Sequence, residues 1–389
     1  MSQVELTTLG KSCEFFNGKA HEKSIDENGK YIVVNSKFIS SEGKSFKRTN
    51  EQLFPLYKGD IVMVMSDVPN GKALAKCFII DQDDTYSLNQ RICCIRSKEF
   101  ETKYLYYQLN RHEHFLAFNN GENQTNLRKD DILACPLIKP SMEEQKRLVN
   151  QIDLAFNELK KAGSNVNINI LNSLELYDGV ISKYLKETTE NFGVKPLGEI
   201  AEILNGGTPD TKVKEFWDGD ILWITPKDMG KLESIYVGDT ERKITDKGLK
   251  NSSAKLLPIN SVILSSRAPI GHLAINTKPI STNQGCKGIV PNKNLDSLFL
   301  YYFLKHSVEL LNELGTGTTF KELSGSKLAT VSVPFPPLEE QHRLVSIFSK
   351  LENSTKSLTE KYKQKIEIIE QLKSGILKRA FENELIEAE

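Results

Sequence analysis

Two stretches of the chain carry apolar residues at steps of three, four or seven, with charged and polar residues between them. One follows Pro140 and the other follows Pro336. This spacing is typical of one apolar face on a long helix. Glu follows the proline closely in both, where the helix dipole favours an acid. We expect a helix of about forty residues, roughly 60 Å long, in each stretch. The apolar positions are Leu148, Ile152, Ala155, Leu159, Val166, Ile170, Tyr177, Ile181 and Tyr184, then Leu344, Phe348, Leu351, Leu358, Tyr362, Ile366, Ile369, Leu372 and Ile376.

Gly163 and the alternating pattern that runs on to Ile170 argue locally for a break or a strand. The second stretch lacks this feature, so we expect one helix that is weaker near Gly163. An apolar stripe needs an apolar partner, either a nearby sheet or another helix. Two equivalent stripes in one chain favour an antiparallel coiled coil between them.

The segments ahead of these helices show short β-branched runs that end at Gly, Pro, Asn or Asp, which predicts strands. The runs are YIVVN, GDIVMVM and AKCFII, then ILWIT, NSVILSS and GHLAIN. We therefore predict an α+β fold with irregular mixed β-sheets. Two similar domains at 1–140 and 191–336 are expected to alternate with long-helix regions at 141–190 and 337–389.

The chain repeats itself. PSMEEQKRLV from Pro140 returns as PPLEEQHRLV from Pro336, an offset of 196 residues. Upstream the offset is smaller: Asn89-Gln90 answers Asn283-Gln284 at 194, the YIVVNSK run answers ILWITPK at 190, and Asn17-Gly18 answers Asn205-Gly206 at 188. Loops of different length in two copies of one domain produce such a drift. The chain is thus a tandem, pseudo-two-fold duplication.

Composition narrows the class of protein but not its partner. The 389 residues include 51 Lys and Arg against 51 Asp and Glu, so global charge argues for neither nucleic acid nor membrane. There is no signal-peptide pattern and no apolar run of membrane-spanning length, so we expect a cytoplasmic protein. The six cysteines show no zinc-ligand spacing, and Cys93 and Cys94 are expected to be buried, reduced thiols.

This duplicated unit resembles the specificity subunit of type I restriction-modification systems. The resemblance covers essentially the whole chain. It rests on the two EEQ-x-RLV helix openings, GGTP at 206–209, ITPKD at 224–228, SSRAPIG at 265–271 and TNQG at 282–285. It implies that the two front domains are target recognition domains, each reading one half of a bipartite DNA target.

The resemblance also implies partners. The helices would set the spacer and dock two methyltransferase subunits, with restriction subunits joining through the complex and no membrane involved. This chain would be non-catalytic and bind no cofactor, while S-adenosylmethionine, ATP and Mg²⁺ belong to partner subunits. Expected partner-binding residues at the helix openings are Glu144, Gln145, Arg147, Glu340, Gln341 and Arg343.

The chemistry of the front domains fits DNA recognition. Arg267 and Lys227 stand on turns bounded by Gly or Pro, and arginine pairs bidentately with guanine. Asparagine and glutamine amides suit adenine. Gly206 and Gly207 would let the backbone approach closely and offer N–H groups to a phosphate. The candidate DNA-binding residues are Lys37, Asp67, Asn70, Lys72, Asn89, Gln90, Arg91, Gly206, Gly207, Thr208, Lys227, Arg267, Asn283, Gln284 and Lys287.

The two halves are expected to read different bases. Aligning MSDVPNGKA with SSRAPIGHL places Asp67 where the second copy has Arg267, and an aspartate suits cytosine N4. Each candidate also has a structural interpretation: amides cap turns, glycines solve turn geometry, and Asp67 terminates a strand.

Two other functions remain as alternatives. The sequence contains no phosphate-binding loop, nucleophile elbow or amine-methyltransferase motif. Asp210, Glu241 and Lys243 imitate the acid, acid and lysine of a metal-dependent nuclease, a match that arises easily by chance. A coiled-coil scaffold without DNA readout would show the same helices. Exposed turns that differ between the two domains favour recognition over scaffolding.

Overall fold

The computed structural model describes residues 5–69, 71–267, 269–317 and 321–388, with side chains described as far as Phe381. The chain divides into two compact units, Met1–Val166 with Gln364–Glu389, and Asn167–Lys363. Each unit holds one front domain and parts of both long helices. Within the described residues, no helix combines the length and the apolar character needed to cross a membrane.

The front domain of the first unit is built on a four-stranded sheet in the order β2-β9-β5-β7 and a three-stranded sheet in the order β4-β3-β8. Its strands are β1 (Glu5–Thr8), β2 (Glu14–Asn17), β3 (Tyr31–Val34), β4 (Lys47–Thr49), β5 (Ile61–Val64), β6 (Ser66–Asp67), β7 (Cys77–Ile79), β8 (Tyr86–Leu88), β9 (Ile92–Arg96), β10 (Thr125–Asn126) and β11 (Pro136–Lys139). Its helices are α1 (Leu9–Ser12), α2 (Ser36–Ser40), α3 (Thr102–Leu109), α4 (Glu113–Leu116) and α5 (Lys129–Leu133).

The front domain of the second unit has a five-stranded sheet in the order β13-β21-β18-β19-β15 and a four-stranded sheet in the order β16-β14-β20-β17. Its strands are β12 (Val194–Pro196), β13 (Ala201–Asn205), β14 (Trp217–Ile224), β15 (Tyr236–Val237), β16 (Arg242–Ile244), β17 (Leu256–Leu257), β18 (Val262–Ser266), β19 (Ile270–Asn276), β20 (Ile280–Thr282), β21 (Cys286–Pro291) and β22 (Ser332–Pro334). Its helices are α7 (Leu197–Ile200), η1 (Lys214–Phe216), α8 (Pro226–Met229), α9 (Asp246–Lys250), α10 (Ser297–His306), α11 (Val308–Leu314) and α12 (Gly325–Ala329).

Each apolar run that predicted a strand forms one. The strand β18 is buried at all five positions because it lies between β21 and β19. The strand β5 is likewise buried throughout between β9 and β7. Central strands covered on both faces read as unbroken apolar runs, which is the pattern these segments show.

Strand registers confirm the repeat. Phe15 pairs with Ile95 between β2 and β9, as Ile203 pairs with Ile289 between β13 and β21, at offsets of 188 and 194. The parallel pairs β3–β8 and β14–β20 reproduce the offsets of 190 and 194. Parallel and antiparallel pairs coexist in β4-β3-β8 and in β16-β14-β20-β17, so the expected α+β fold with mixed sheets is confirmed.

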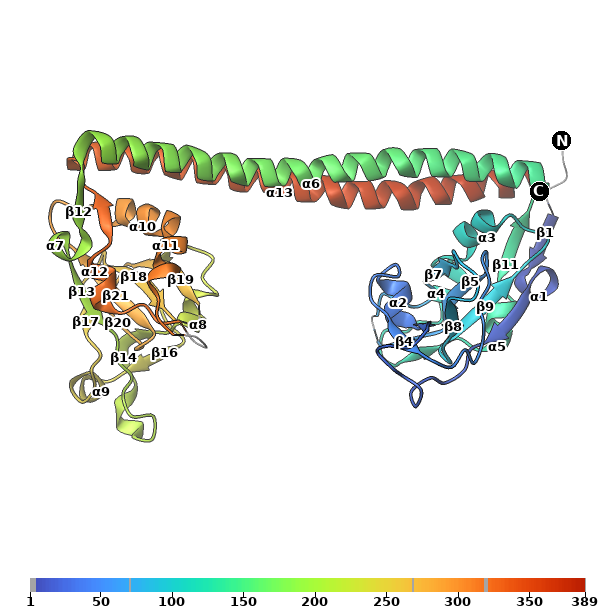
Figure 1. Ribbon diagram of the computed structural model, residues 1–389, viewed down its shortest axis with the longest axis horizontal. Coiled ribbons are helices and arrows are strands. Elements are labelled where there is room, and N and C mark those ends of the chain that lie inside the picture. The colour runs from blue at the N-terminus through green and yellow to red at the C-terminus, as the bar shows by residue number, and fades with distance from the viewer. Residues whose placement is uncertain (1–4, 70, 268, 318–320, 389) are drawn as a thin grey trace. The chain divides into compact units, whose positions relative to one another are not determined.

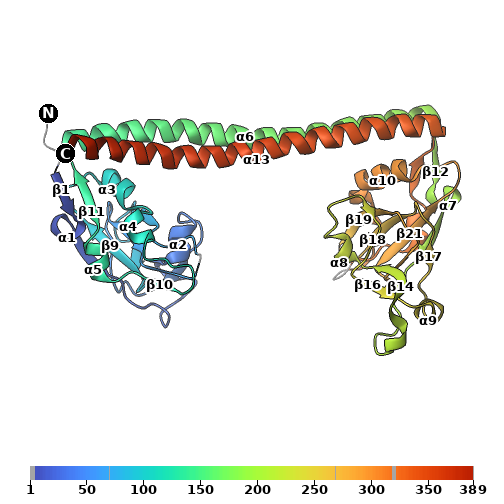
Figure 2. The ribbon, with the colours of Figure 1, turned by 180° about the vertical axis from the view of Figure 1, so that it is seen from behind.

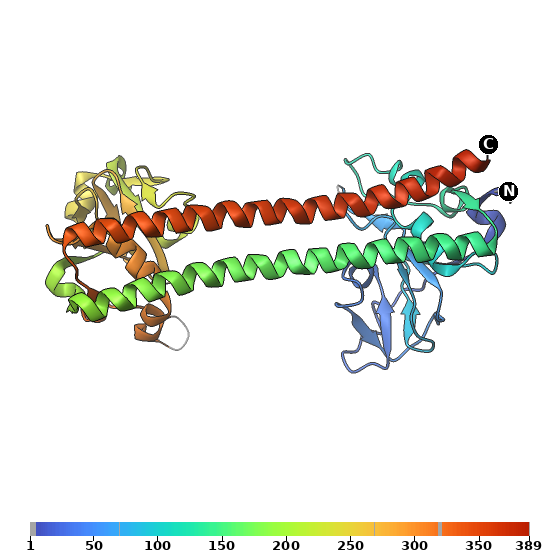
Figure 3. The same cartoon turned by 90° about the horizontal axis from the view of Figure 1, so that it is seen from above.

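The two long helices are α6 (Met142–Phe192) and α13 (Leu338–Ala388). The helix α6 continues through Gly163, where an added Cβ would meet nothing within 4 Å. Within the second unit, the end of α6 and the start of α13 lie side by side (Figure 3). The ring of Tyr184 lies 6.2 Å from that of Phe348, centroid to centroid. Burial raises the pKa of Tyr177, and the charge of Glu352 adds to that rise. Tyr177 precedes Tyr184 on α6, whereas Glu352 follows Phe348 on α13, so the two helices run antiparallel within this unit.

In the second unit, α10 lies between the five-stranded sheet and the helix pair in both side views (Figure 1 and Figure 2). Tyr302 on α10 contacts Phe348 of α13 at 5.7 Å between ring centroids. In the first unit, Tyr104 on α3 contacts Phe381 of α13 at 5.5 Å. Each front domain therefore shares its core with the helix segments of its own unit.

The helix-opening glutamines fasten each helix to its front domain. Gln145 Nε2 donates to the carbonyl of Pro140 at 3.0 Å, and Gln145 Oε1 accepts from the backbone N–H of Glu101 at 2.8 Å. Gln341 makes the same two kinds of contact in the second unit, to the Pro336 carbonyl and the Asp296 N–H. The two glutamines are 1% and 0% exposed. The expectation that they bind a partner is wrong, because their amides are buried and bonded internally.

Candidate nucleic-acid interface

The candidate residues of the second domain gather where the parallel strands β14 and β20 end. The Asn283 N–H donates to the carbonyl of Ile224 at 2.9 Å, which joins the turn after β20 to the end of β14. Thr225 and Asp228 form a capping box at the start of α8. This cap fixes the short helix, whose second residue, Lys227, is exposed to solvent. The geometry therefore presents an exposed cation beside the 283–285 turn.

Asn283 and Gln284 of this turn form a hydrogen-bonded cluster with the side chain of Thr208. Asn283 Oδ1 accepts from the Gly285 N–H at 2.7 Å, and its Nδ2 donates to Thr208 Oγ1 at 2.9 Å. Gln284 Oε1 accepts from both Asn283 Nδ2 and Thr208 Oγ1. Because these bonds occupy its carbonyl oxygen, the exposed Gln284 side chain keeps its amide N–H groups available for a ligand.

The glycines beside this cluster do not act as expected. The N–H of Gly206 donates to the Cys286 carbonyl and that of Gly207 donates to the Thr282 carbonyl. An added Cβ would lie 2.0 Å from the Asn283 oxygen at Gly206 and 2.2 Å from the Ala254 nitrogen at Gly207. The expectation that their N–H groups bind a phosphate is wrong. Gly206 lets the backbone pack closely against the 283–285 turn, and Gly207 lets it pack against Ser253 and Ala254.

The first domain presents the same surface with different details. Lys37 is exposed on α2, whose cap is Asn35. The Asn89 N–H donates to the Val34 carbonyl at 3.1 Å, and an added Cβ on Gly18 would again lie 2.0 Å from the asparagine oxygen. Here the glutamine differs, since Gln90 Nε2 donates to Glu22 Oε1 at 2.8 Å. The next residue, Arg91, is exposed.

Asp67 organises the loop that follows it. Its carboxylate accepts from the backbone N–H groups of Val68, Ala73 and Leu74 at 2.9, 2.6 and 3.1 Å. These three bonds favour the structural interpretation of Asp67 over cytosine recognition. Lys72 in the same loop is exposed. The candidate Asn70 lies outside the described residues.

The strand registers correct the alignment of Asp67 with Arg267. Ser66 pairs with Asn126 between β6 and β10, and Arg267 forms the corresponding bridge with Glu322. Asn126 and Glu322 stand at the 196-residue offset of the helix openings. Ser66 therefore occupies the position of Arg267, and the expected exchange of an acid for a base is wrong by one residue. The other alignment matches Pro69 with Pro269, which this register sets one residue apart.

Arg267 lies between the 283–285 turn and a buried lysine. Its Nε would be 3.2 Å from a Cβ added to Gly285, and its Nη1 lies 3.7 Å from Glu322 Oε2. Lys287 on β21 is 6% exposed. Burial lowers the pKa of Lys287, with Arg267 adding to that effect and Glu322 opposing it. Two cations thus flank one carboxylate at this edge of the surface.

Sequence reasoning missed two equivalent basic residues, Lys47 on β4 and Arg242 on β16, which lie on the strands next to β3 and β14. Arg242 pairs with Trp223 in the β14–β16 register, as Lys47 pairs with Val33 in the β3–β4 register. The Arg242 guanidinium lies 3.8 Å from the centroid of the Trp217 ring, which holds it in place. The repeated basic dipeptide in SFKRTN and TERKIT is the signal that would have found them.

The charged residues of the helix openings pair within their own helices. Arg147 bonds Glu144, and Arg343 Nε bonds Glu340 Oε2 at 2.6 Å. These bonds hold the pKa values of Glu144 and Glu340 below their usual range. Both arginine side chains are 53% exposed, so this pair of equivalent patches stays available as a candidate partner surface.

The nuclease alternative gains no support. Glu241 pairs with Lys231 at 3.8 Å, and Lys243 pairs with Asp239 at 3.2 Å. Within the described ranges, no three His, Cys, Asp or Glu side chains are placed to hold a metal ion. The cysteines, all of which lie in those ranges, are free thiols, and Cys93 and Cys94 are fully buried as expected.

Comparison with known proteins points to one family. The family described as type I restriction modification DNA specificity domain matches residues 1–169 and again residues 189–368. The MjaIX specificity subunit of Methanocaldococcus jannaschii is 40% identical over 194 residues, 49% of this chain and 44% of that protein. The EcoR124I/EcoR124II specificity subunit of Escherichia coli is 34% identical over 181 residues, 45% of this chain and 44% of that protein. The matched part thus spans less than half the length of these relatives.

Solved structures share the fold. A chain from a study of assembly and conformational transition in a type I restriction-modification system superposes with a TM-score of 0.73 at 19% identity, covering 97% of both chains. The crystal structure of the HsdS subunit from Thermoanaerobacter tengcongensis gives a TM-score of 0.58 at 19% identity, covering 97% of this chain and 96% of that one. With the specificity domain matched twice, the chain belongs to the family of type I restriction modification DNA specificity domains.

Proposed function

We propose that this chain is the sequence-specific DNA-binding specificity subunit of a type I restriction-modification complex. Each front domain reads one half of a bipartite double-stranded target, and the long helices set the spacer between the halves. The chain itself is non-catalytic. The observation that supports this most is the duplication of one surface, with an exposed lysine, Lys37 or Lys227, beside an Asn-Gln turn in each domain.

The side chains on that surface match both tasks of a DNA-binding protein. Lysines such as Lys37 and Lys227 contact phosphates, which fixes the position on the duplex without reading bases. Amide side chains such as Gln284 read base edges, adenine in particular. Because Gln90 is bonded to Glu22 while Gln284 is bonded to Thr208 and Asn283, the two surfaces offer different patterns of donors and acceptors. Unlike half-sites follow from this difference.

The proposed partners follow from the second duplicated feature. Two methyltransferase subunits dock on the equivalent patches formed by Glu144 with Arg147 and by Glu340 with Arg343, and restriction subunits join through that complex. Similar patches bind the same partner in similar ways, so one chain recruits two copies. S-adenosylmethionine, ATP and Mg²⁺ are bound by those partners. The complex acts on DNA in the cytoplasm.

A matched pair of variants tests the division of the reading. The complex of the chain with its methyltransferase subunits is prepared with Gln284→Ala or with Gln90→Ala. Its methylation of genomic DNA is then mapped. We expect each variant to relax the sequence preference in one half-site and to leave the other half-site unchanged. Equal relaxation of both halves by either variant would refute separate reading, and a wild-type complex without sequence preference would favour the scaffold alternative.

A further inference from the structure

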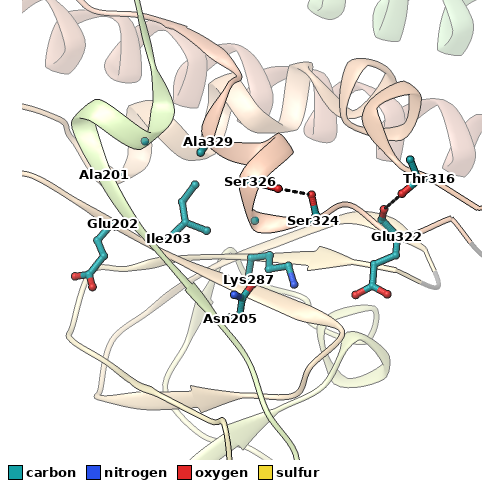
Figure 4. A pocket seen from close by; sticks show the side chains of 12 residues that line it. Ala201, Glu202, Ile203, Asn205, Lys287, Thr316, Glu322, Ser324, Ser326 and Ala329 are labelled. Carbon is teal, nitrogen blue, oxygen red and sulfur yellow. Dashed lines mark hydrogen bonds between the residues drawn. The ribbon is translucent and has the colours of Figure 1, made fainter.

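A cavity of about 980 Å³ opens into the second domain beside the candidate DNA-binding surface. It lies between β13, β21 and the segment that leads into α12 (Figure 4). Its polar lining includes Asn205, Lys287, Glu322, Ser324 and Ser326. No part of the function proposed above uses this cavity.

Lys287 is one of the residues that line the cavity. It is 6% exposed, and its register partner on β13 is Asn205. Figure 4 shows its ammonium pointing across the cavity toward the side that carries Ser324 and Glu322. Among the described residues, none forms a hydrogen bond or an ion pair with the Nζ of Lys287. The ammonium of Lys287 therefore opens into the cavity, where an anion from outside the chain can reach it.

The charges around Lys287 favour an anion. Arg267 and Glu322 both act on it electrostatically. Glu322 is held only loosely by Arg267, at 3.7 Å, and its side chain is 46% exposed. The other acid of the lining, Glu202, points away from Lys287 (Figure 4). Of the two acids in the lining, Glu322 is thus the one that faces Lys287, and Arg267 offsets its charge.

The first domain lacks this arrangement. Cys93 takes the place of Lys287, since it pairs with Asn17 as Lys287 pairs with Asn205. It is fully buried within that domain's apolar core. Lys129, which stands at the 196-residue offset from Gly325, places its Nζ 5.9 Å from the centroid of the Phe15 ring. The polar cavity around a lysine is thus a feature of the second domain, and the first domain serves as an internal comparison.

The cavity adjoins the candidate reading surface. Arg267, which acts on Lys287, also reaches the 283–285 turn, where a Cβ on Gly285 would lie 3.2 Å from its Nε. The same Cβ would lie 3.0 Å from Pro226, the residue before Lys227. A DNA strand that contacts both Gln284 and Lys227 would therefore pass close to the mouth of the cavity.

We propose that this cavity receives a phosphate group of the DNA strand read by the second domain, with Lys287 as its cation. Ser324 and Ser326 supply hydroxyl donors from the wall. Glu322 is the internal anion that leaves Arg267 when the phosphate enters. This inference rests on the proposed function and adds a phosphate site to one half of it.

Salt-dependent binding tests the site in the complex with the methyltransferase subunits. Fluorescence anisotropy with a target duplex and an unrelated duplex gives affinities over a range of salt concentration. Lys287→Met should weaken binding to both duplexes several-fold and reduce the slope of log K against log salt by about 0.9, the value for one phosphate contact. Glu322→Gln should tighten binding to both. Lys293→Met, which removes an exposed lysine beyond the same strand, should change neither.

Folding and ligand source are controlled separately. Thermal unfolding should show Lys287→Met as stable as the wild type, because methionine keeps the apolar stem and removes a charge that makes no bond within the chain. An unchanged salt slope in folded Lys287→Met, with target preference intact, would overturn the phosphate site while leaving the proposed function standing. If inorganic phosphate raises the Tm of the wild type and not of Lys287→Met, and the salt slope is unchanged, the cavity binds free phosphate and the proposal is wrong. Loss of all target preference in the wild type would instead count against the proposed function.

Discussion

Ser66 and Arg267 occupy the same position in the two domains. Ser66 pairs with Asn126, and Arg267 pairs with Glu322, in one register of the duplicated fold. The Ser66 hydroxyl accepts a hydrogen bond from Gln124 Nε2 at 2.9 Å, whereas Arg267 lies 3.7 Å from a carboxylate. A neutral pair in one domain thus corresponds to a charged pair in the other. Different chemistry at equivalent positions is the structural basis that we propose for unlike half-sites.

Replacing Arg267 tests this relationship. Arg267→Ala should weaken DNA binding by about 1 to 3 kcal/mol and relax the preference in one half-site only, as expected when a base-contacting arginine is removed. Ser66→Ala is the matched control and should have a much smaller effect, confined to the other half. The measurement is the affinity of the complex for duplexes substituted in either half. Equal losses in both halves for Arg267→Ala would contradict the assignment.

The buried glutamines should matter for stability. Gln341→Leu leaves the Asp296 N–H and the Asn294 carbonyl without their partner, and each unsatisfied buried group costs about 1 to 3 kcal/mol. We expect a clear fall in the midpoint of denaturant unfolding. His342→Leu, at an exposed neighbouring position, should leave it nearly unchanged. Equal stability of the two variants would show that Gln341 does not hold the helix to its domain.

The partner surface can be tested without disturbing the helix. Exchanging Glu340→Arg together with Arg343→Glu keeps an i, i+3 ion pair but inverts the charge pattern seen by a partner. Sedimentation of the complex should then show one methyltransferase subunit per chain where the wild type shows two. The same exchange at Glu158 and Lys161, an exposed pair in the middle of α6, is the control. A wild-type complex that saturates at one subunit would refute the two-patch assignment.

The thiols should be unreactive in the folded chain. Burial raises the pKa of Cys13 to about 11 and that of Cys93 and Cys135 to about 12. These groups stay protonated in the folded chain but ionise in the unfolded chain above a pH of about 9, so stability should fall as pH rises through that range. At pH 8, an alkylating reagent followed by mass spectrometry should label the chain only after unfolding. Rapid labelling of Cys93 in the native state would contradict its place in the core.

Periodicity and repetition were enough to predict the fold. The offsets of 188, 190 and 194 residues reappear as equivalent strand pairings, because side-chain burial fixes strand register. The same comparison failed after β5, because matching Pro69 with Pro269 aligns Asp67 with Arg267, whereas the strand pairings align Ser66 with Arg267.

The site was predictable only in part. Lysines and Asn-Gln turns at strand ends carry their chemistry in the sequence. The bonds that occupy Gln145 and Gly206 depend on backbone atoms of other segments, which residue types do not reveal. The cavity around Lys287 became visible only when the two folded domains were compared position by position, because Cys93 replaces Lys287 and Lys129 replaces Gly325 in the first domain.

Methylation mapping tests directly whether the two front domains each read one half of the DNA target. Genomic DNA from cells that express this chain with its methyltransferase subunits is sequenced for modified bases. We expect one bipartite motif, with two unlike half-sites and a spacer of fixed length whose bases are unspecified. A single continuous motif, or two identical half-sites, would contradict the division of reading between the two domains.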